Sequence, residues 1–383
     1  MKLKYTFCIL FSLLLLFSCG KSDQPYTIET KDGVKYIHNH APLWYDEPKV
    51  ALEFVQKIGE LEGEDENYLF YEPFEVVRDS EGNIFVVDGG NRRVQKFNAD
   101  GQYIFTIGRE GQGPGEFSDA IVRNSYSINI DSESNIYVND SGNTRIHVFS
   151  SDGKYLRGIR LGKLISFFRL QKSGKLVAQN FFEFSRRINK GEIPKLLEIY
   201  NAKGELLKGF GKIKEFKDET ISMRGNDIFF DVDAEDNIYI SFWRQNRIDK
   251  YSPDGILLLT IDRSLNYELS HKKRILTYPS PIDPAKTMEM PIIDFTSVST
   301  KGLGIDYKGR LWVPTYRRQK KKDEDTKTAT DLIVLEIYDG DGVLLCRLPN
   351  DFYFNRFRVF RDRVYFIDAS YEMCVYEYKI VEK

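Results

Sequence analysis

The chain has 383 residues, of which 42% are hydrophobic and 29% are charged, and its formal net charge is −2 at pH 7. A chain of this length can bury a large core without disulfide bonds or structural metal ions. The nearly balanced charge gives no concentrated basic surface, which argues against a nucleic-acid partner.

The N-terminus has the features of a targeting segment. Two lysines precede an apolar run over residues 5–17, which is shorter than the roughly 20 residues that a membrane-spanning helix needs. The run ends in LFSCG at residues 16–20, which resembles the lipobox of bacterial lipoproteins. This resemblance implies a lipoprotein signal peptide over residues 1–18 and an acylated Cys19 that anchors the mature chain. The expected location is the cell envelope, at the outer membrane, and both the periplasmic face and the cell-surface face are compatible with the sequence.

Removal of the signal changes the charge and the cysteine count. Residues 1–18 contain two lysines and no acids, so the net charge of −2 becomes −4. Cys8 leaves with the signal and Cys19 carries the lipid, which leaves Cys346 and Cys374. One disulfide bond between these two is compatible with an oxidising compartment, but two cysteines do not make a disulfide scaffold.

A ten-residue pattern recurs along the chain. The sequence DSEGNIFVVD at residues 79–88 has close copies at 131–140, 233–242 and 306–315, and weaker copies at 171–180 and 360–368. Each copy has a polar turn followed by β-formers, which is typical of a tight hairpin. A second turn follows, with its glycine 17 residues after Ile84, Ile136 and Ile238. A four-stranded unit repeated six times predicts an all-β fold, a six-bladed β-propeller with antiparallel blades.

The count of strands predicts how the ring closes. The last repeat supplies only three strands before the chain ends, and a strand around residues 52–58 precedes the first repeat. We expect this N-terminal strand to be the outer strand of the last blade, because ring closure removes the open sheet edge. The propeller is therefore expected over residues 50–383, with residues 19–49 as an N-terminal tether and lead-in.

A glycine-rich stretch, GREGQGPGEF at residues 108–117, follows the outermost strand of the first repeat. It lacks the Gly-Lys-Ser/Thr end and the following helix of a phosphate-binding loop. We interpret it as the connection from the rim of one blade to the axis of the next.

The repeat resembles the NHL repeat. The matching segments are Gly82–Val86, Asn91–Phe97, Asp100–Gly101 and Gly108–Phe117, and Asn143–Phe149 repeats the second of them. The whole chain, with its lipobox, is similar to the six-bladed β-propeller lipoproteins abundant in Bacteroidales. The resemblance implies the fold, but it does not imply one activity, because propellers carry many unrelated functions.

Strand alternation assigns a set of side chains to the central channel. One parity of the innermost strands gives apolar residues that should pack between blades, such as Val76, Ile128, Phe168 and Phe230. The opposite parity gives the candidate ligand-binding residues Glu75, Asn129, Arg169, Asp231, Arg356 and Arg358. Two interpretations remain open. The charges either form a self-neutralising ion network or form a cationic pocket for a carboxylate, such as an acidic glycan or a peptide terminus.

The sequence gives little support for a metal site or for catalysis. None of the four histidines falls on an expected innermost strand, and residues 231–237 resemble a calcium loop but lack its glycine and its bidentate glutamate. No Gly-x-Ser-x-Gly motif and no cysteine–histidine pair is evident. We therefore predict no catalytic residue, no metal and no cofactor.

Two long insertions interrupt the repeats. Residues 263–297 are too apolar for a linker, and we expect them to cap one mouth of the channel. Residues 317–331 are expected to be a solvated hairpin extension.

These observations favour a lipid-anchored propeller of the cell envelope that acts as a binding module without catalysis. The alternative is a hydrolase or lyase that acts on glycans or lactones at the axial channel. A third hypothesis is a subunit that binds an envelope protein through its broad face.

Overall fold

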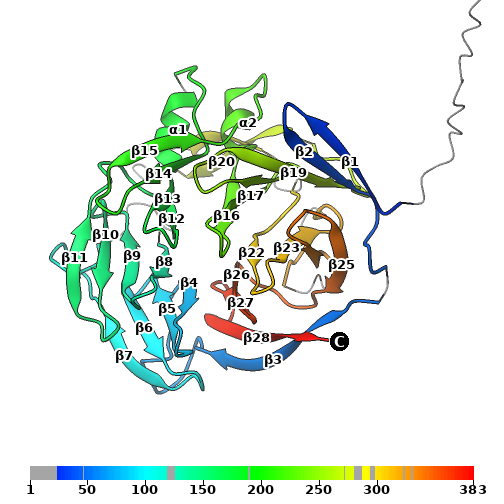
Figure 1. The fold of residues 1–383 in the computed structure, drawn as a ribbon. Helices are drawn as coiled ribbons and strands as arrows, with labels where there is room; N and C mark the ends of the chain where they lie inside the picture. Colours follow the sequence, from blue (N-terminus) through cyan, green and yellow to red (C-terminus); the bar gives the residue numbers. More distant parts are fainter. Residues whose placement is uncertain are drawn as a thin grey trace, which may run out of the picture.

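The computed structural model describes residues 24–45, 47–118, 126–188, 190–270, 272–279, 287–293, 298–321, 324–327, 329 and 331–383. The expected signal peptide and Cys19 lie outside these residues. The described strands form seven sheets, and six of them are arranged around a central axis (Figure 1), which confirms the six-bladed propeller.

The first three blades each contain four antiparallel strands, named in order from the axis outward. Blade one contains β4 (Pro73–Arg78), β5 (Ile84–Asp88), β6 (Arg93–Phe97) and β7 (Tyr103–Ile107). Blade two contains β8 (Ile128–Ile130), β9 (Ile136–Asp140), β10 (Arg145–Phe149) and β11 (Tyr155–Ile159). Blade three contains β12 (Phe167–Leu170), β13 (Leu176–Gln179), β14 (Leu197–Tyr200) and β15 (Leu206–Phe210).

Blades four and six include strands from the N-terminal segment, whereas blade five is built from consecutive strands alone. Blade four contains β16 (Ile228–Val232), β17 (Ile238–Phe242), β18 (Ile248–Tyr251) and β19 (Leu257–Arg263), followed by β2 (Val34–Asn39) and β1 (Tyr26–Lys31). Blade five contains β22 (Gly304–Ile305), β23 (Leu311–Tyr316), β24 (Ile333–Tyr338) and β25 (Leu344–Pro349). Blade six contains β26 (Arg356–Phe360), β27 (Arg363–Asp368), β28 (Cys374–Glu382) and β3 (Val50–Ile58).

The core lies between neighbouring blades. Phe85 and Val94 of blade one pack with Ile136 and Val138 of blade two in one apolar cluster. Of the residues that strand parity assigned to blade packing, Val76, Ile128 and Phe168 are each 0% exposed and Phe230 is 3% exposed. Inner strands can be apolar on both faces because each blade is covered on both sides.

An N-terminal belt, residues 34–58, crosses the outer edges of three blades. Strand β2 pairs in parallel with β19 of blade four. The backbone N–H groups of Leu43 and Trp44 then donate to the carbonyls of Leu344 and Leu345 in blade five, each at 2.8 Å. Strand β3 finally pairs antiparallel with β28, which confirms the expected closure of the ring. The β1–β2 hairpin was not anticipated, because its strands lie outside the repeat.

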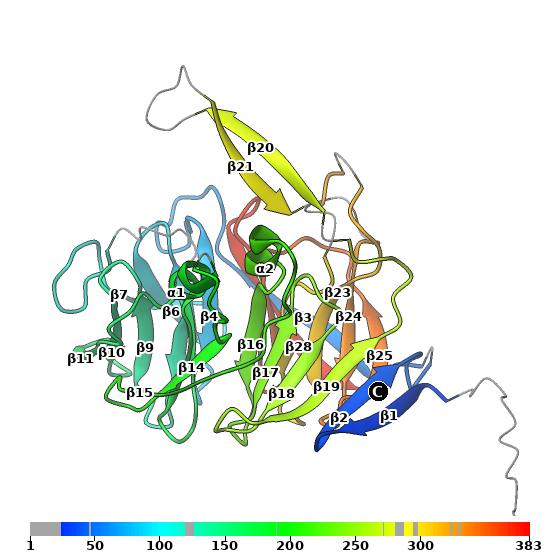
Figure 2. The same ribbon diagram turned by 90° about the horizontal axis from the view of Figure 1, so that it is seen from above.

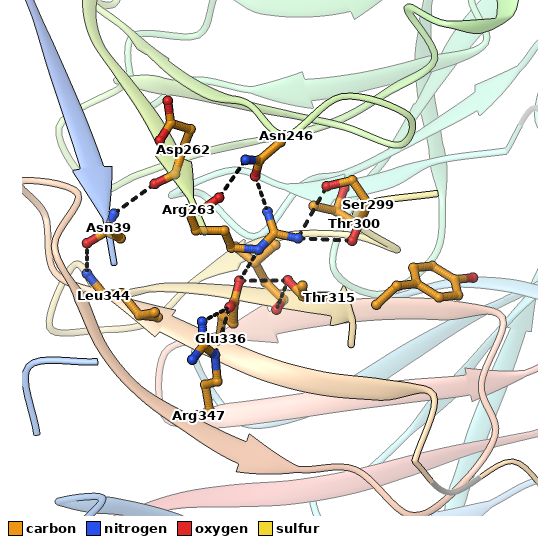
Figure 3. Close-up of polar contacts among 12 residues, drawn as sticks. Asn39, Asn246, Asp262, Arg263, Ser299, Thr300, Thr315, Glu336, Leu344 and Arg347 are labelled. Carbon is orange, nitrogen blue, oxygen red and sulfur yellow. Dashed lines mark hydrogen bonds and ion pairs between the residues drawn. The ribbon is translucent and has the colours of Figure 1, made fainter. Parts of the chain in front are cut away.

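Buried polar contacts hold blades four and five together beneath this belt (Figure 3). The Asn39 side chain accepts a hydrogen bond from the N–H of Leu344 at 2.8 Å and donates to the carbonyl of Asp262 at 3.2 Å. Nearby, Glu336 pairs with Arg263 at 2.7 Å and with Arg347 at 2.9 Å. The belt is therefore fixed by side chains as well as by strand pairing.

The glycine-rich connection folds back on itself and is held by blade two. Gly108 has φ +77°, and a Cβ there would lie 2.2 Å from the ring of Phe117, so only glycine fits. Asn143 donates to the carbonyl of Gly111 at 3.1 Å, and Arg145 donates to that of Gln112. In blades one and two the Asn-x-Arg motif therefore binds the loop that enters the blade, since Asn91 and Arg93 donate to the carbonyl of Leu69 in the same way.

The turns between inner strands are held by their own aspartates. Asp233 accepts hydrogen bonds from the N–H groups of Glu235 and Asn237 at 2.9 and 2.8 Å, and Asp79 does the same in blade one. The calcium-like stretch 231–237 is therefore the end of β16 followed by an ordinary repeat turn.

The insertions gather on one face of the ring (Figure 2). They include α1 (Phe181–Ile188), α2 (Glu219–Arg224) and the hairpin of β20 (Lys273–Pro279) with β21 (Thr287–Ile293). Both helices are short, and no helix in the described ranges is long and apolar enough to cross a membrane.

Candidate binding site at the propeller axis

Four charged side chains from four blades meet at the axis. They are Glu75 on β4, Arg169 on β12, Asp231 on β16 and Arg358 on β26. Arg169 lies 3.4 Å from Glu75 and 3.0 Å from Asp231, and Arg358 lies 2.8 Å from Glu75 and 2.9 Å from Asp231. Each acid contacts both arginines, so the set closes into a neutral quartet.

The quartet is buried, and its members are between 3% and 7% exposed. Burial and repulsion by Arg358 lower the pKa of Arg169 to about 10, while Glu75 and Asp231 act against this shift. Arg169 thus remains charged at neutral pH. These contacts are those that the ion-network interpretation predicts, and they leave Arg169 and Arg358 already paired.

Asn129 does not join the quartet. Its side-chain amide donates to the carbonyl of Phe168 at 3.2 Å and accepts from the N–H of Leu170 at 3.4 Å. Asn129 therefore links the inner strands of blades two and three, and its polar atoms are engaged with the backbone.

A cavity of about 150 Å³ opens on the face that carries the insertions, directly above the quartet. Its lining comes mainly from the first residues of the innermost strands and the segments just before them. The lining residues are Phe74, Glu75, Ser166, Phe167, Arg169, Gln179, Ile228, Phe229, Phe230, Lys301, Gly302, Leu303, Arg356, Phe357 and Arg358.

A second cavity, of about 730 Å³, lies at the opposite face. Val77, Val232 and Phe360 line it, and each lies one or two residues beyond a member of the quartet on the same strand. The quartet therefore lies between the two cavities.

Two cations of the upper cavity have no acidic partner among the described residues. The Arg356 guanidinium lies 4.2 Å from the ring centroid of Phe74. The Lys301 ammonium lies 4.7 Å from the ring centroids of both Tyr353 and Phe354. Neither side chain makes an ion pair or a hydrogen bond with another described residue, so two cations face the cavity without a direct acidic contact.

The electrostatics of these two cations follow from their surroundings. Burial lowers the pKa of Arg356, and Glu75 partly opposes this shift. Burial and repulsion by Arg356 lower the pKa of Lys301 to about 8, against a weaker attraction to Asp368. A group with this pKa is charged at neutral pH and gives up its proton under mildly basic conditions.

Sequence reasoning placed Arg356 in the channel but missed Lys301. Lys301 precedes β22, which has only two residues, and Gly302 with φ +156° interrupts the alternation. Parity counted along the strand therefore fails at this position. Its position immediately before an innermost strand was the one feature of the sequence that could have indicated Lys301.

The histidines and cysteines that the sequence offered as candidates do not form a metal site or a disulfide bond in the described part of the chain. His147 is 0% exposed and lies 3.1 Å from Asp140. Among the described residues, no group of three or more His, Cys, Asp or Glu side chains could hold a metal ion. Cys346 and Cys374 are both buried and free, so no disulfide bond joins them in this structure.

The 263–297 insertion is not a cap in its described part. Lys273 of β20 pairs with Asp218 at the start of α2 at 2.6 Å. Figure 1 places β20 beside α2, toward blades three and four and away from the centre of the ring. No described residue of the hairpin lines the cavity.

Comparison with known proteins supports the fold and the family. A putative exported protein from Bacteroides fragilis is similar over 91% of this chain and 99% of its own, with a TM-score of 0.56 and 13% identity. A DUF4221 family member from Bacteroides vulgatus is similar over 88% and 99%, with a TM-score of 0.55 and 12% identity. At these identities the likeness shows the fold alone.

Sequence relatives carry the same repeat. NHL repeat-containing protein 3 from Homo sapiens is 34% identical over 91 residues, which are 23% of this chain and only 25% of that protein. The model of the 6-bladed beta-propeller family DUF5128 matches residues 57–256, which is more than half of the chain. The fold supports a binding or scaffold module. This chain belongs to the 6-bladed beta-propeller family DUF5128.

Proposed function

We propose that this protein is a lipid-anchored propeller of the cell envelope that binds a small anionic ligand in the upper axial cavity and does not catalyse a reaction. The observation that carries the proposal is the pair of cations, Arg356 and Lys301, that face the cavity without an acidic partner among the described residues. The lipobox ending at Cys19 supports the anchor.

The paired and unpaired cations have different roles in this proposal. Arg169 and Arg358 are neutralised by Glu75 and Asp231, so they form the floor of the cavity. Arg356 and Lys301 remain available to a ligand. An anion that enters this cavity would compensate their charge, and the apolar walls would strengthen the attraction by lowering the local dielectric.

The composition of the lining supports binding over catalysis. Glu75 is the sole carboxylate among the lining residues, and it is paired with two arginines. Its two carboxylate oxygens are engaged by these guanidinium groups, one oxygen with Arg169 and the other with Arg358. General acid–base catalysis needs a group that can exchange a proton near neutral pH, and the lining offers only Lys301.

The test is calorimetric titration with acetate, benzoate and glucuronate, as carboxylates of different size and polarity. At least one of them should bind the wild-type protein, and Arg356→Gln should weaken that binding by about 2 kcal/mol, roughly thirtyfold. Arg356→Lys should retain part of the affinity. Arg109→Gln is the matched control, because Arg109 is an exposed arginine outside the cavity. Binding that is equal in Arg356→Gln and in the wild type would overturn the proposal, as would the absence of binding by all three acids.

A further inference from the structure

The walls of the upper cavity are aromatic. Five of its lining residues are phenylalanines, and Ile228 and Leu303 add further apolar surface. Phe74, Phe230 and Phe357 are buried at 7%, 3% and 6% exposure, so their rings are fixed by the packing between blades.

The uncharged polar side chains of the lining are few. They are Ser166 and Gln179, against seven apolar residues. A sugar acid would bring several hydroxyl groups into the cavity, and each hydroxyl that loses water without gaining a partner reduces affinity. A site built to recognise a sugar would need more donors and acceptors than these two side chains provide.

The volume of the cavity limits the size of the part of a ligand that it can enclose. A closed apolar cavity of about 150 Å³ accommodates a benzene ring, and the upper cavity has this volume. The guanidinium of Arg356 stacks on Phe74 and that of Arg169 stacks on Phe167, at 4.2 and 4.0 Å from the ring centroids. Each ring thus screens one face of a cation, while the N–H edges of Arg356 stay free of described partners.

We infer that the ligand of this cavity is an amphipathic carboxylate, with an apolar body about the size of one six-membered ring and its carboxylate at Arg356 and Lys301. This inference rests on the proposed anion site and adds the chemical class of the ligand. It departs from the acidic glycan that the charges alone suggested. Burial of an apolar body against the phenylalanine walls is favourable, whereas the same walls leave the hydroxyl groups of a sugar without hydrogen-bond partners.

The inference is tested with ring-sized probes on the full mature domain. Benzoate and cyclohexanecarboxylate should bind at least about tenfold more tightly than glucuronate or acetate, because only the first two bury an apolar ring. Benzamide, which has the same shape without the charge, should bind at least about tenfold more weakly than benzoate. Benzoate binding should also show a negative heat-capacity change, and acetate binding should show little.

The outcomes separate this inference from the proposed function. If glucuronate binds as tightly as benzoate and Arg356→Gln loses it, the anion site stands and the amphipathic ligand is refuted. If benzamide binds as tightly as benzoate, the charge is irrelevant and both proposals fail. If benzoate binding is strong and is lost in Arg356→Gln but kept in Arg109→Gln, both are supported.

Discussion

Removal of one acid from the axial quartet should strongly destabilise the fold. Glu75 is 3% exposed and contacts both Arg169 and Arg358. In Glu75→Gln the two arginines share Asp231 alone, which leaves a buried positive charge without compensation. Breaking a buried ion pair in this way typically costs about 3 to 5 kcal/mol, and we expect a loss of about 3 kcal/mol in the free energy of unfolding.

The measurement is urea denaturation of the wild type and of the variant. The free energies of unfolding are compared with the same m value, which is the slope of that free energy against urea concentration. Glu110→Gln is the matched control. Glu110 pairs with Arg92 at 2.9 Å but is 67% exposed, so its loss should cost less than about 1 kcal/mol. The double variant Glu75→Gln/Arg358→Gln restores neutrality and should recover part of the loss. If Glu75→Gln is no more destabilising than Glu110→Gln, Glu75 does not compensate a buried charge in the quartet.

Three further predictions concern the belt, the anchor and the cavity. Deletion of residues 24–45 should expose the edge of β19, lower the melting temperature and promote association seen by light scattering; an unchanged monomer would contradict this. Cys19→Ala should move the protein to the soluble fraction, and retention on membranes after a salt wash would refute the lipid anchor. Benzoate affinity should fall by up to about tenfold per pH unit above pH 8, because Lys301 with its pKa of about 8 must take up a proton to hold the anion. Lys301→Arg should remove this dependence, and a flat wild-type profile would exclude Lys301 from the site.

Much of the fold could be predicted because the repeat is local. The turn residues Asp79 and Asp233 and the strands that follow them recur at fixed spacing, and each carries its own hydrogen bonds. Ring closure by β3 followed from counting strands. The β1–β2 hairpin could not be predicted in this way, because its place beside β19 depends on contacts between distant segments, such as Asn39 with Leu344.

The sequence predicted part of the membership of the site, but it could not predict the ion pairing within it. Parity correctly placed Glu75, Arg169, Arg356 and Arg358 on the channel side, where all four line the cavity. Parity could not tell which arginines would be neutralised, since that depends on the depth of each side chain along the axis. It also could not place a side chain from an irregular segment such as Lys301.

Strand register explains why Arg356 is left without an acid. Arg358 lies opposite Tyr365 and Asp231 lies opposite Tyr239, and both tyrosines are near the start of the second strand of their blade. Glu75 lies opposite Val87 and Arg356 opposite Ile367, near the end of the second strand, which places both nearer the upper face. Register alone would therefore pair Glu75 with Arg356.

Glu75 instead reaches down to Arg169 and Arg358. These two arginines and Asp231 form a lower level of side chains along the axis. Asp231 is the one acid of that level, so without Glu75 the level would keep a buried positive charge. Neutralising the more deeply buried level is worth more, because a charge farther from water is more costly to leave unpaired. The upper level then keeps Arg356 and Lys301 but no free acid among the described residues. The cavity is thus positive because Glu75 and Asp231 form ion pairs with only two of the four cations. A ligand can balance the charge of the other two.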